Sequence, residues 1–443
     1  RVWGVPLPIF INKKTKEPLR DQKVIERIAN IYEKQGSDCW FTDDIKVFLG
    51  DEYNPNDYEK LNDIVEVWFD SGSTHSFVLE KRKDLKWPAD MYLEGSDQHR
   101  GWFHSSLLES CGTRGQAPFK SILSHGFVVD GKGLKMSKST GNVISPEDIL
   151  KDFGADILRV WVASSDYAED LRIDKSILAQ HAESYRKIRN TFRFILGNLK
   201  DNFEKKEFNK IDFKEFDELE QYILHKLFVI DLSVKENLKN YNFHKLYKEL
   251  LNFCTLDLSS FYFDIRKDVL YCDDLKSKKR KDCVTVLNIV LESLLKWFAP
   301  ILVFTTDEIY GLISKEENSI HEYNFVSIPK DWQNDTLNKK WIQLHKIKQE
   351  ANIAIEEKRS NKEIGSSLEA ELRITINSKN FELLEGIDLA EYFITSKAER
   401  IKSDTNDELL ISVKKTKGTK CPRCWKILDD KCQRCEKVSS LSK

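Results

Sequence analysis

Residues 133–142 read Gly-Leu-Lys-Met-Ser-Lys-Ser-Thr-Gly-Asn and lie between a strand-like segment and a helix that starts with a proline. The glycines let backbone N–H groups converge on an anion. Lys135 and Lys138 supply compact, mobile positive charges that suit a phosphate whose charge grows during a reaction. Composition alone favours an ordinary solvated loop, since Lys, Ser and Gly gather in such loops. The order strand, loop, helix makes this stretch a candidate anion-binding loop in an α/β fold.

A second α/β feature lies upstream of the lysine loop. Two strand-like segments, 90–95 and 121–129, flank a helical segment at 101–110. This order implies parallel strands, and parallel α/β units bind ligands at the carboxyl ends of their strands. We therefore expect a ligand site just after residues 95 and 125.

Polar residues follow the first of these strand ends. Glu94 and Asp97 can accept hydrogen bonds from sugar hydroxyls or an ammonium group, and Gly95 lets the backbone approach a ligand. The alternative is that Asp97 only caps the following helix. His125 ends the second strand, and an isolated histidine is often structural. His99 and His104 are expected to be packing or surface residues.

The rest of the chain changes character twice. Apolar residues recur at helical spacing from about 175 to 330, which predicts a helix bundle, with Pro300 ending one helix and opening the next. A polar helix is expected at 336–359, and alternation over 368–376 predicts a half-buried strand. Further strands are expected near 392–395 and 408–413. The predicted architecture is multidomain: an α/β Rossmann-like half at 1–170, an all-α bundle at 171–330, a small α+β module at 331–418 and a metal-binding tail at 419–443.

Composition excludes some classes of function. The 443 residues carry 70 Lys+Arg against 72 Asp+Glu, a net charge of −2, so the chain is not a globally basic nucleic-acid binder. No apolar run reaches the length of a membrane span. Five of the nine cysteines are scattered, which fits a reducing cytoplasm.

The other four cysteines have the spacing of a metal site. Two Cys-x-x-Cys pairs supply four soft thiolates for a closed tetrahedral zinc site, which stabilises a segment without a core of its own. Disulfides and an iron–sulfur cluster are the alternatives. Nine Lys/Arg against three Asp/Glu between residues 414 and 437 leave the tail basic even with a zinc tetrathiolate. The predicted ligands are Cys421, Cys424, Cys432 and Cys435.

Several motifs resemble one known family. The run Lys-Met-Ser-Lys-Ser at 135–139 is similar to the signature loop of class I aminoacyl-tRNA synthetases. The string at 94–103, Trp-Phe-Asp-Ser-Gly at 68–72 and Cys-Pro-Arg-Cys-Trp at 421–425 are similar to the isoleucine-specific family of that class. The resemblance runs in order along essentially the whole chain.

The resemblance implies an ATP-dependent isoleucine–tRNA ligase that forms isoleucyl-adenylate, with Mg²⁺ beside ATP, and transfers isoleucine to tRNA(Ile). It implies that Lys135 and Lys138 are catalytic. The residues implied in the two binding sites are Glu94, Gly95, Asp97, His125, Phe127 and Lys138 for ATP and the adenylate, and Trp68, Gln98 and Trp102 for the amino acid.

The resemblance also implies that an ATP motif and an editing domain lie upstream of Arg1, so that this chain is the C-terminal portion of a longer enzyme. We expect a cytoplasmic monomer. Two other classes share parts of this pattern: a non-catalytic tRNA-binding or regulatory protein derived from a synthetase, and a nucleotidyltransferase that uses the same fold. The four residues Glu94, Asp97, Lys135 and Lys138 disfavour the first, and the bundle and the cysteine tail disfavour the second.

Overall fold

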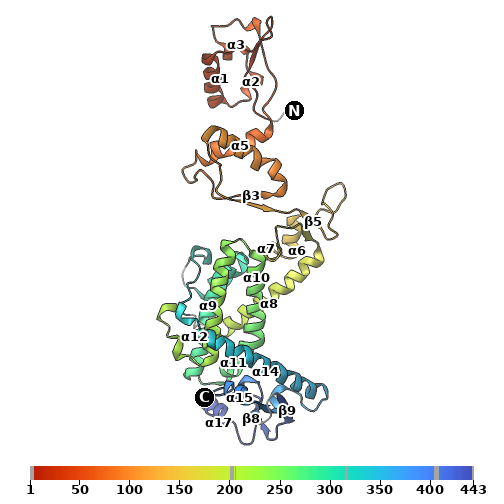
Figure 1. Ribbon diagram of the computed structural model, residues 1–443, viewed down its shortest axis with the longest axis vertical. Helices are drawn as coiled ribbons and strands as arrows, with labels where there is room; N and C mark the ends of the chain where they lie inside the picture. Colours follow the sequence, from red (N-terminus) through yellow and green to blue (C-terminus); the bar gives the residue numbers. More distant parts are fainter. Residues whose placement is uncertain (1–3, 200–203, 205, 315–316, 404–408, 442–443) are drawn as a thin grey trace. The chain divides into compact units, whose positions relative to one another are not determined.

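A computed structural model describes residues 4–199, 204, 206–314, 317–403 and 409–441 (Figure 1). The chain divides into two compact units, which are described separately: the first holds residues 1–128 and 167–171, and the second holds residues 129–166 and 172–443. None of the described helices is both long enough and apolar enough to cross a membrane.

The first unit begins with a small lobe that has its own core. An antiparallel strand pair packs with three helices around Trp40, whose ring lies 4.9 Å from Phe10 and 5.1 Å from Phe48 between ring centres. Lys60 donates to the Trp40 and Asp43 carbonyl oxygens at 2.6 and 2.7 Å, which ties the second strand to the helices. The elements of this lobe are β1 (Phe10–Asn12), α1 (Gln22–Gln35), α2 (Cys39–Thr42), α3 (Ile45–Leu49) and β2 (Tyr58–Lys60).

The remainder of the first unit contains the expected parallel strand pair. α4 (Val67–Gly72) precedes β3 (Tyr92–Gly95), α5 (Trp102–Arg114) and β4 (Ile122–His125), and β3 pairs with β4 in parallel. The expected strand at 121–129 is interrupted, because β5 starts only at residue 128. At the break the Gly126 N–H donates to the Tyr167 carbonyl, and a Cβ at this glycine would stand 2.3 Å from the Glu169 carbonyl oxygen.

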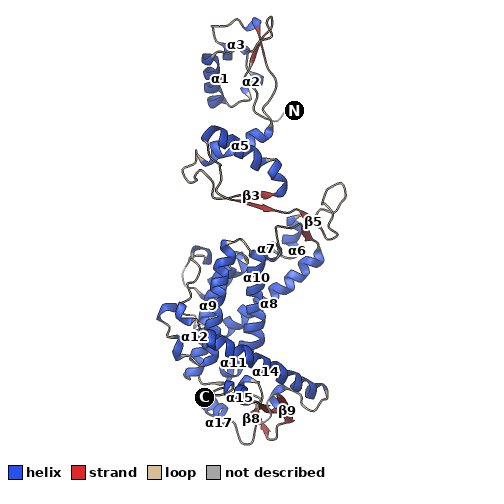
Figure 2. Cartoon of the chain, in the orientation of Figure 1, coloured by secondary structure: helices blue, strands red, loops and turns tan. Residues whose placement is uncertain are grey.

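Helices make up most of the second unit (Figure 2). Two short strands, β5 (Val128–Asp130) and β6 (Leu171–Ile173), pair with each other. The helices that form the bundle and its approach are α6 (Pro146–Asp152), α7 (Ala155–Ser164), α8 (Lys175–Leu199), α9 (Glu218–Lys239), α10 (Phe243–Asn252), a π-helical stretch (Phe253–Tyr262), α11 (Phe263–Cys272), α12 (Lys278–Phe298) and α13 (Val303–Ile313).

The expected role of Pro300 is half right. α12 ends at Phe298, just before the proline, but α13 begins three residues after it and is not opened by it. The start of α13 is fixed instead by Asp156, whose carboxylate accepts the backbone N–H groups of Phe304 and Thr305 at 3.2 and 2.8 Å. A carboxylate from another helix therefore satisfies the free N–H groups of this helix end.

The small module packs a long helix and two short ones with a three-stranded sheet. β7 is the central strand, parallel to β8 and antiparallel to β9, and its alternate residues Ala370, Leu372, Ile374 and Ile376 are fully buried, as the alternation predicted. The elements are α14 (Asp335–Ser360), β7 (Ala370–Ile376), α15 (Ser378–Leu383), α16 (Leu389–Tyr392), β8 (Lys397–Lys402) and β9 (Leu410–Lys415). The predicted strand at 408–413 corresponds to β9, although Glu408 lies outside the described residues.

The strand predicted near 392–395 is wrong. Residues 389–392 form the short helix α16, whose start is capped because Asp388 accepts the Glu391 N–H at 3.0 Å. The buried ammonium of Lys348 donates to the Tyr392 carbonyl at the end of that helix. A cation on the last carbonyls of a helix stabilises its C-terminus, so tertiary contacts override the apolar pattern here.

A buried ion-pair network joins the bundle to the module. Arg266 of α11 donates to both carboxylate oxygens of Glu220 of α9 at 2.7 and 2.6 Å, and to Glu391 of α16 at 2.8 Å. The side chains of Arg266 and Glu220 are 4% and 0% exposed. Lys279 also pairs with Glu391 at 2.5 Å. Buried charges of opposite sign thus hold three helices at one point.

We expect Arg266→Met to lower the free energy of unfolding by roughly 3–5 kcal/mol, because the Glu220 carboxylate would remain buried without its cation. Lys267→Met on the same helix is the matched control, since its ion pair with Asp264 is about half exposed and such pairs contribute less than ~1 kcal/mol. Urea unfolding followed by circular dichroism measures both. Similar losses for the two variants would contradict this account of the network.

Candidate functional site

The carboxyl ends of β3 and β4 bring several predicted residues together in the first unit. Their register places Gly95 opposite His125. A Cβ at Gly95 would stand 2.8 Å from Asp97 Oδ1 and 3.7 Å from the His125 ring, so both side chains lie beside this buried glycine. Glu94 and Asp97 are exposed. This edge therefore presents two carboxylates and an imidazole around a close backbone approach.

Gln98 organises the turn between β3 and α5. Its Oε1 accepts the Trp102 N–H at 2.9 Å, and its Nε2 donates to Asp97 Oδ2 at 3.3 Å. Gln98, and not Asp97, thus caps the start of α5, so the reading of Asp97 as a helix cap is wrong. Asp97 is left as an exposed carboxylate whose position the Gln98 amide helps to fix.

Both predicted pocket tryptophans lie close to Gly101. Trp102 stacks on Tyr92 with ring centres 4.2 Å apart and planes at 7°, and its Nε1 donates to the Ser71 carbonyl at 3.0 Å. Trp68, on α4, is 42% exposed, and its ring lies 3.2 Å from where a Cβ on Gly101 would stand. These contacts fix two flat apolar surfaces near Gln98. Tyr92 was not singled out from the sequence, because an aromatic residue in a strand is usually core.

The next residues considered from the sequence are Phe127, His125 and His99. Phe127 is 49% exposed, and its N–H donates to Asp170 Oδ1 at 2.7 Å. His125 Nδ1 lies 2.8 Å from the Gly126 carbonyl oxygen. His99 packs edge-on against Phe103 at 5.6 Å, as a packing residue would.

The lysine loop lies in the second unit, and two side chains hold it. Asp130 Oδ1 accepts the N–H groups of Lys132 and Leu134 at 3.0 and 2.8 Å, and Asp130 Oδ2 accepts from the Asn142 amide at 2.9 Å. The same amide group donates to the Lys135 carbonyl at 3.2 Å. The bond from Asn142, followed by that from Leu134, holds the pKa of Asp130 below its ordinary value.

Asn142 also closes the serine-rich part of the loop. Its Oδ1 accepts the Ser137 N–H at 2.9 Å and the Thr140 hydroxyl at 2.6 Å. Lys135 and Lys138 are exposed, and no ion pair is recorded for them in the described part of the chain. The loop thus holds its backbone firmly while leaving two ammonium groups available to an anion. The sequence could have pointed to Asp130 and Asn142, because Asp and Asn at the two ends of a turn often hydrogen-bond to the backbone of that turn.

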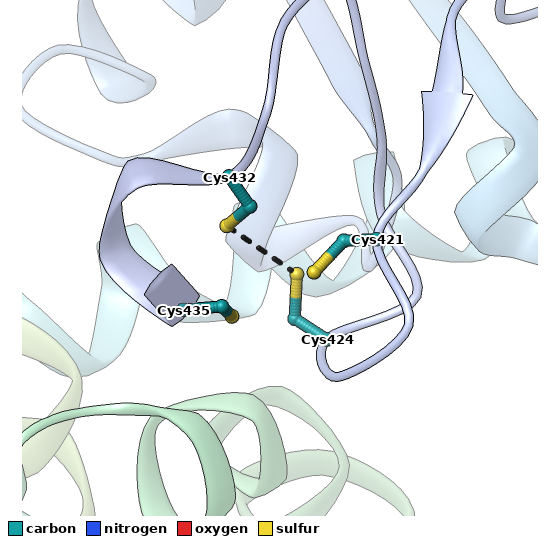
Figure 3. Close-up of side chains that lie close together, drawn as sticks. All are labelled: Cys421, Cys424, Cys432 and Cys435. Atoms are coloured by element: carbon teal, nitrogen blue, oxygen red, sulfur yellow. Dashed lines mark hydrogen bonds between the residues drawn. The ribbon is translucent and has the colours of Figure 1, made fainter. Parts of the chain in front are cut away.

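The four tail cysteines converge as predicted (Figure 3). Cys421 and Cys424 lie in the turn between β10 (Thr419–Lys420) and β11 (Ile427–Leu428), and the second pair lies at the start of α17 (Gln433–Leu441). All four sulfur atoms lie within 4.8 Å of one another, and the Cys424 and Cys432 Sγ atoms are 3.9 Å apart. Zn–S bonds of about 2.3 Å in a tetrahedron place sulfur atoms about 3.8 Å apart. The cluster therefore has the size and donor set of a structural metal site.

The protein also favours a thiolate at one of these positions. Burial alone would raise the pKa of Cys421, but the backbone N–H groups of Cys424 and Arg423 lower it to about 7. Burial raises the pKa of Cys424 and of Cys435. A metal ion supplies the positive charge that lets such buried thiols ionise together.

Comparison with known proteins identifies the class first. Residues 1–174 match the family model described as tRNA synthetases class I (I, L, M and V), and residues 220–376 match the anticodon-binding domain of tRNA ligase. The fold is similar to an Agrobacterium radiobacter K84 LeuRS in a ternary complex with tRNA and LeuAMS, with a TM-score of 0.57 at 15% identity over 85% of this chain and 43% of that one. The chain belongs to the class I tRNA synthetases.

Within that class its relatives are isoleucine–tRNA ligases. The ligase of Pelagibacter ubique is 65% identical over 98% of this chain and 48% of its own length. The ligase of Zymomonas mobilis is 43% identical over 99% of this chain and 47% of its own length. The chain is thus a member of the isoleucine–tRNA ligase family, and it spans about half the length of the curated relatives that it matches.

The contacts around Gly101 lead to a prediction for the first unit. Gly101→Ala places a Cβ 2.6 Å from Gln98 Oε1 and against the Trp68 ring, so we expect a loss of about 1–3 kcal/mol in unfolding free energy and a changed near-UV spectrum. Gly112→Ala, within the helix that Gly101 precedes, is the control, because nothing lies within 4 Å of its Cβ position and alanine favours a helix by up to ~1 kcal/mol. Equal behaviour of the two variants in urea unfolding would refute the described packing.

Proposed function

We propose that a polypeptide carrying this chain is an isoleucine–tRNA ligase, which activates L-isoleucine with ATP and transfers it to tRNA(Ile). The observation that carries the proposal is 65% identity to such a ligase over 98% of the chain. The strand-end carboxylates and the lysine loop support it, since both keep the residue types that the chemistry needs.

In the proposed reaction the isoleucine carboxylate oxygen attacks the α-phosphorus of ATP. A bond forms between that oxygen and phosphorus, and the bond to pyrophosphate breaks, so no protein nucleophile is required. The protein supplies position and charge. Lys135 and Lys138 would neutralise charge that develops on the phosphates, and Mg²⁺ bound with ATP would add to that neutralisation.

The first unit would supply the binding groups. Glu94, Gly95 and Asp97 would contact the adenylate at the strand edge. His125 and Phe127 would lie near adenine. The flat faces of Trp68 and Trp102 would bound the isoleucine side chain, because rigid apolar walls fix the shape of a small hydrophobic ligand, with Gln98 facing the amino-acid group.

The proposal also covers the metal-binding tail, the surfaces that contact tRNA, the domain limits, and the location and oligomeric state of the protein. The four cysteines would hold one structural zinc ion, and the bundle and basic tail would face tRNA phosphates. The domain limits 1–170, 171–330, 331–418 and 419–443 stay predictions. A cytoplasmic monomer is proposed from the scattered free cysteines and the family.

A non-catalytic tRNA-binding protein is the competing function. It is disfavoured because Glu94, Asp97, Lys135 and Lys138 are all retained, and because the last two are exposed and available. A nucleotidyltransferase with another acceptor is disfavoured by the match to the anticodon-binding domain.

Lys138→Ala should lower the rate of isoleucine activation by about 10²–10³-fold while changing isoleucine affinity less than about twofold, because the ammonium acts on charge that develops in the transition state. Pyrophosphate exchange measures the rate. The assay uses a longer polypeptide, in which this chain is joined to the part of an isoleucine–tRNA ligase relative that this chain does not cover. Lys132→Ala, in the same loop, is the control and should retain activity. Equal losses in rate and affinity for Lys138→Ala would contradict the assigned role.

The chain should contain one zinc ion per molecule after dialysis, and Cys421→Ser should reduce zinc affinity at least about tenfold, since a serine hydroxyl does not replace a thiolate ligand. Elemental analysis and native mass spectrometry give the metal content. Cys111→Ser is the matched control, because Cys111 is exposed and lies in the other unit. Bound iron with acid-labile sulfide, or an unchanged zinc affinity of Cys421→Ser measured against a competing chelator, would refute the zinc assignment.

A further inference from the structure

Each Cys-x-x-Cys pair carries an arginine at its third position, and both arginines reach the same helix end. Arg423 donates through Nη1 to the Cys272 carbonyl at 2.9 Å and through Nη2 to the Tyr271 carbonyl at 3.0 Å. These are carbonyls of the last turn of α11, which have no partner within the helix. A guanidinium there satisfies them and opposes the negative end of the helix dipole.

Arg434 binds two carboxylates at the same end of α11. It forms a two-bond contact with Asp268 at 2.7 and 2.9 Å and a third bond with Asp273 at 3.1 Å. The side chains of Arg434, Asp268 and Asp273 are only 33%, 21% and 15% exposed. Two-bond contacts of this kind between partly buried groups are stronger and more directional than exposed pairs.

A fifth cysteine is buried where the tail contacts α11. Cys272, the last residue of α11, is 4% exposed and packs in one buried cluster with Cys421, Cys424 and Cys435. Its thiol lies 3.9 Å from the Arg423 carbonyl. The tail therefore covers a thiol of the bundle that is not one of the four proposed metal ligands.

The tail also builds one wall of a pocket. A cavity of about 340 Å³ is lined by residues of α11, α16 and the tail, among them Ile265 and Tyr271 of α11 and Trp425 of the tail. Trp425 has a φ of +66° and is 61% exposed, a conformation that costs a non-glycine residue about 1 kcal/mol or more. The turn that imposes this φ is closed by the Trp425 N–H on the Cys421 carbonyl. The shape of the pocket thus depends on the fold of the cysteine turns.

In the described tail, the two arginine-bearing segments contact each other through their thiols, with the Cys424 and Cys432 sulfur atoms 3.9 Å apart. The first segment is also tied to the small module, because the Ile427 N–H donates to Ser396 Oγ at 2.6 Å and Lys397 pairs with Asp429. The described tail contains two strands of two residues each and one short helix, and its buried residues are chiefly the cysteines themselves. Segments of this kind without a core take their fold from the bound metal. The separation between Arg423 and Arg434, and hence their joint grip on α11, should therefore depend on metal occupancy.

We propose that the metal-loaded cysteine cluster is a clamp on the C-terminal end of α11, acting through Arg423 and Arg434, so that metal occupancy controls the order of residues 268–273, the burial of Cys272 and the presence of the adjoining pocket. Arg423 and Arg434 are positioning residues in this proposal. It rests on the proposed metal site, and goes beyond it by coupling that site to the helical bundle.

The first experiment compares this chain loaded with zinc and after removal of the zinc by a chelator. Metal content is measured on each sample. Iodoacetamide labelling followed by mass spectrometry reports the exposure of Cys272, and hydrogen exchange reports residues 268–273. We expect both rates to rise at least about tenfold on zinc removal. Cys283 is the internal control: it is 0% exposed in α12 and should stay protected in both samples.

The second experiment tests the arginines while all four cysteines remain. The double variant Arg423→Met, Arg434→Met should still bind one zinc ion and yet label at Cys272 as fast as the zinc-free chain. Lys431→Met is the matched control, since its ion pair with Glu436 is mostly exposed, and it should behave as the unmodified chain does. If the double variant binds no zinc, Asp268→Asn with Asp273→Asn replaces it, because these changes leave the tail untouched and should also raise Cys272 labelling.

Three results would overturn the proposal. The first is Cys272 labelling that does not change when zinc is removed. The second is a zinc-loaded arginine variant in which Cys272 stays protected, and the third is the same protection in the aspartate variant. Absence of zinc from the unmodified chain would instead refute the proposed metal site, so the two failures are distinguishable by metal content.

Discussion

Burial of the Arg266 guanidinium is the constraint around which the second unit is arranged. A buried cation is tolerated only when carboxylates surround it, and here Glu220 comes from α9 and Glu391 from α16. The bundle and the module therefore meet at one geometry, because moving either helix would leave a charge unpaired. The other end of α11 receives Arg423 and Arg434 from the tail. One short helix thus receives contacts from three parts of the unit.

Around the candidate site, the residues that would contact a ligand differ from the side chains that hold them in position. The residues that we assign to binding or catalysis, such as Glu94, Asp97 and Lys138, are exposed. The side chains that hold them are less exposed and hydrogen-bond both to the backbone and to neighbouring side chains. Gln98 caps α5, and Asn142 with Asp130 closes the lysine loop. A site that works by position and charge needs such supports, because a displaced ammonium or carboxylate loses most of its effect on a phosphate.

The family assignment and the geometry carry different parts of the functional argument. Identity to isoleucine–tRNA ligases over nearly the whole chain defines the family, while the chain spans about half the length of those relatives. The structure adds how the residues are held: a strand register that sets Gly95 opposite His125, a stacked Tyr92–Trp102 pair, and four converging thiols. The roles of the individual site residues remain proposals that the variants test.

The sequence alone determined what depends on residues close together in the chain. Periodicity predicted the order β3, α5, β4, the helices α8 and α14 and the central strand β7, and cysteine spacing predicted the metal cluster. It failed where a distant partner decides the outcome. Asp156 sets the start of α13 from 148 residues away in sequence, and Lys348 meets the end of α16 across 44 residues. Arg423 and Arg434 look like ordinary charges of a basic tail, and only the tertiary structure shows that they meet α11, because hydrogen bonds and buried ion pairs between distant segments leave no local pattern.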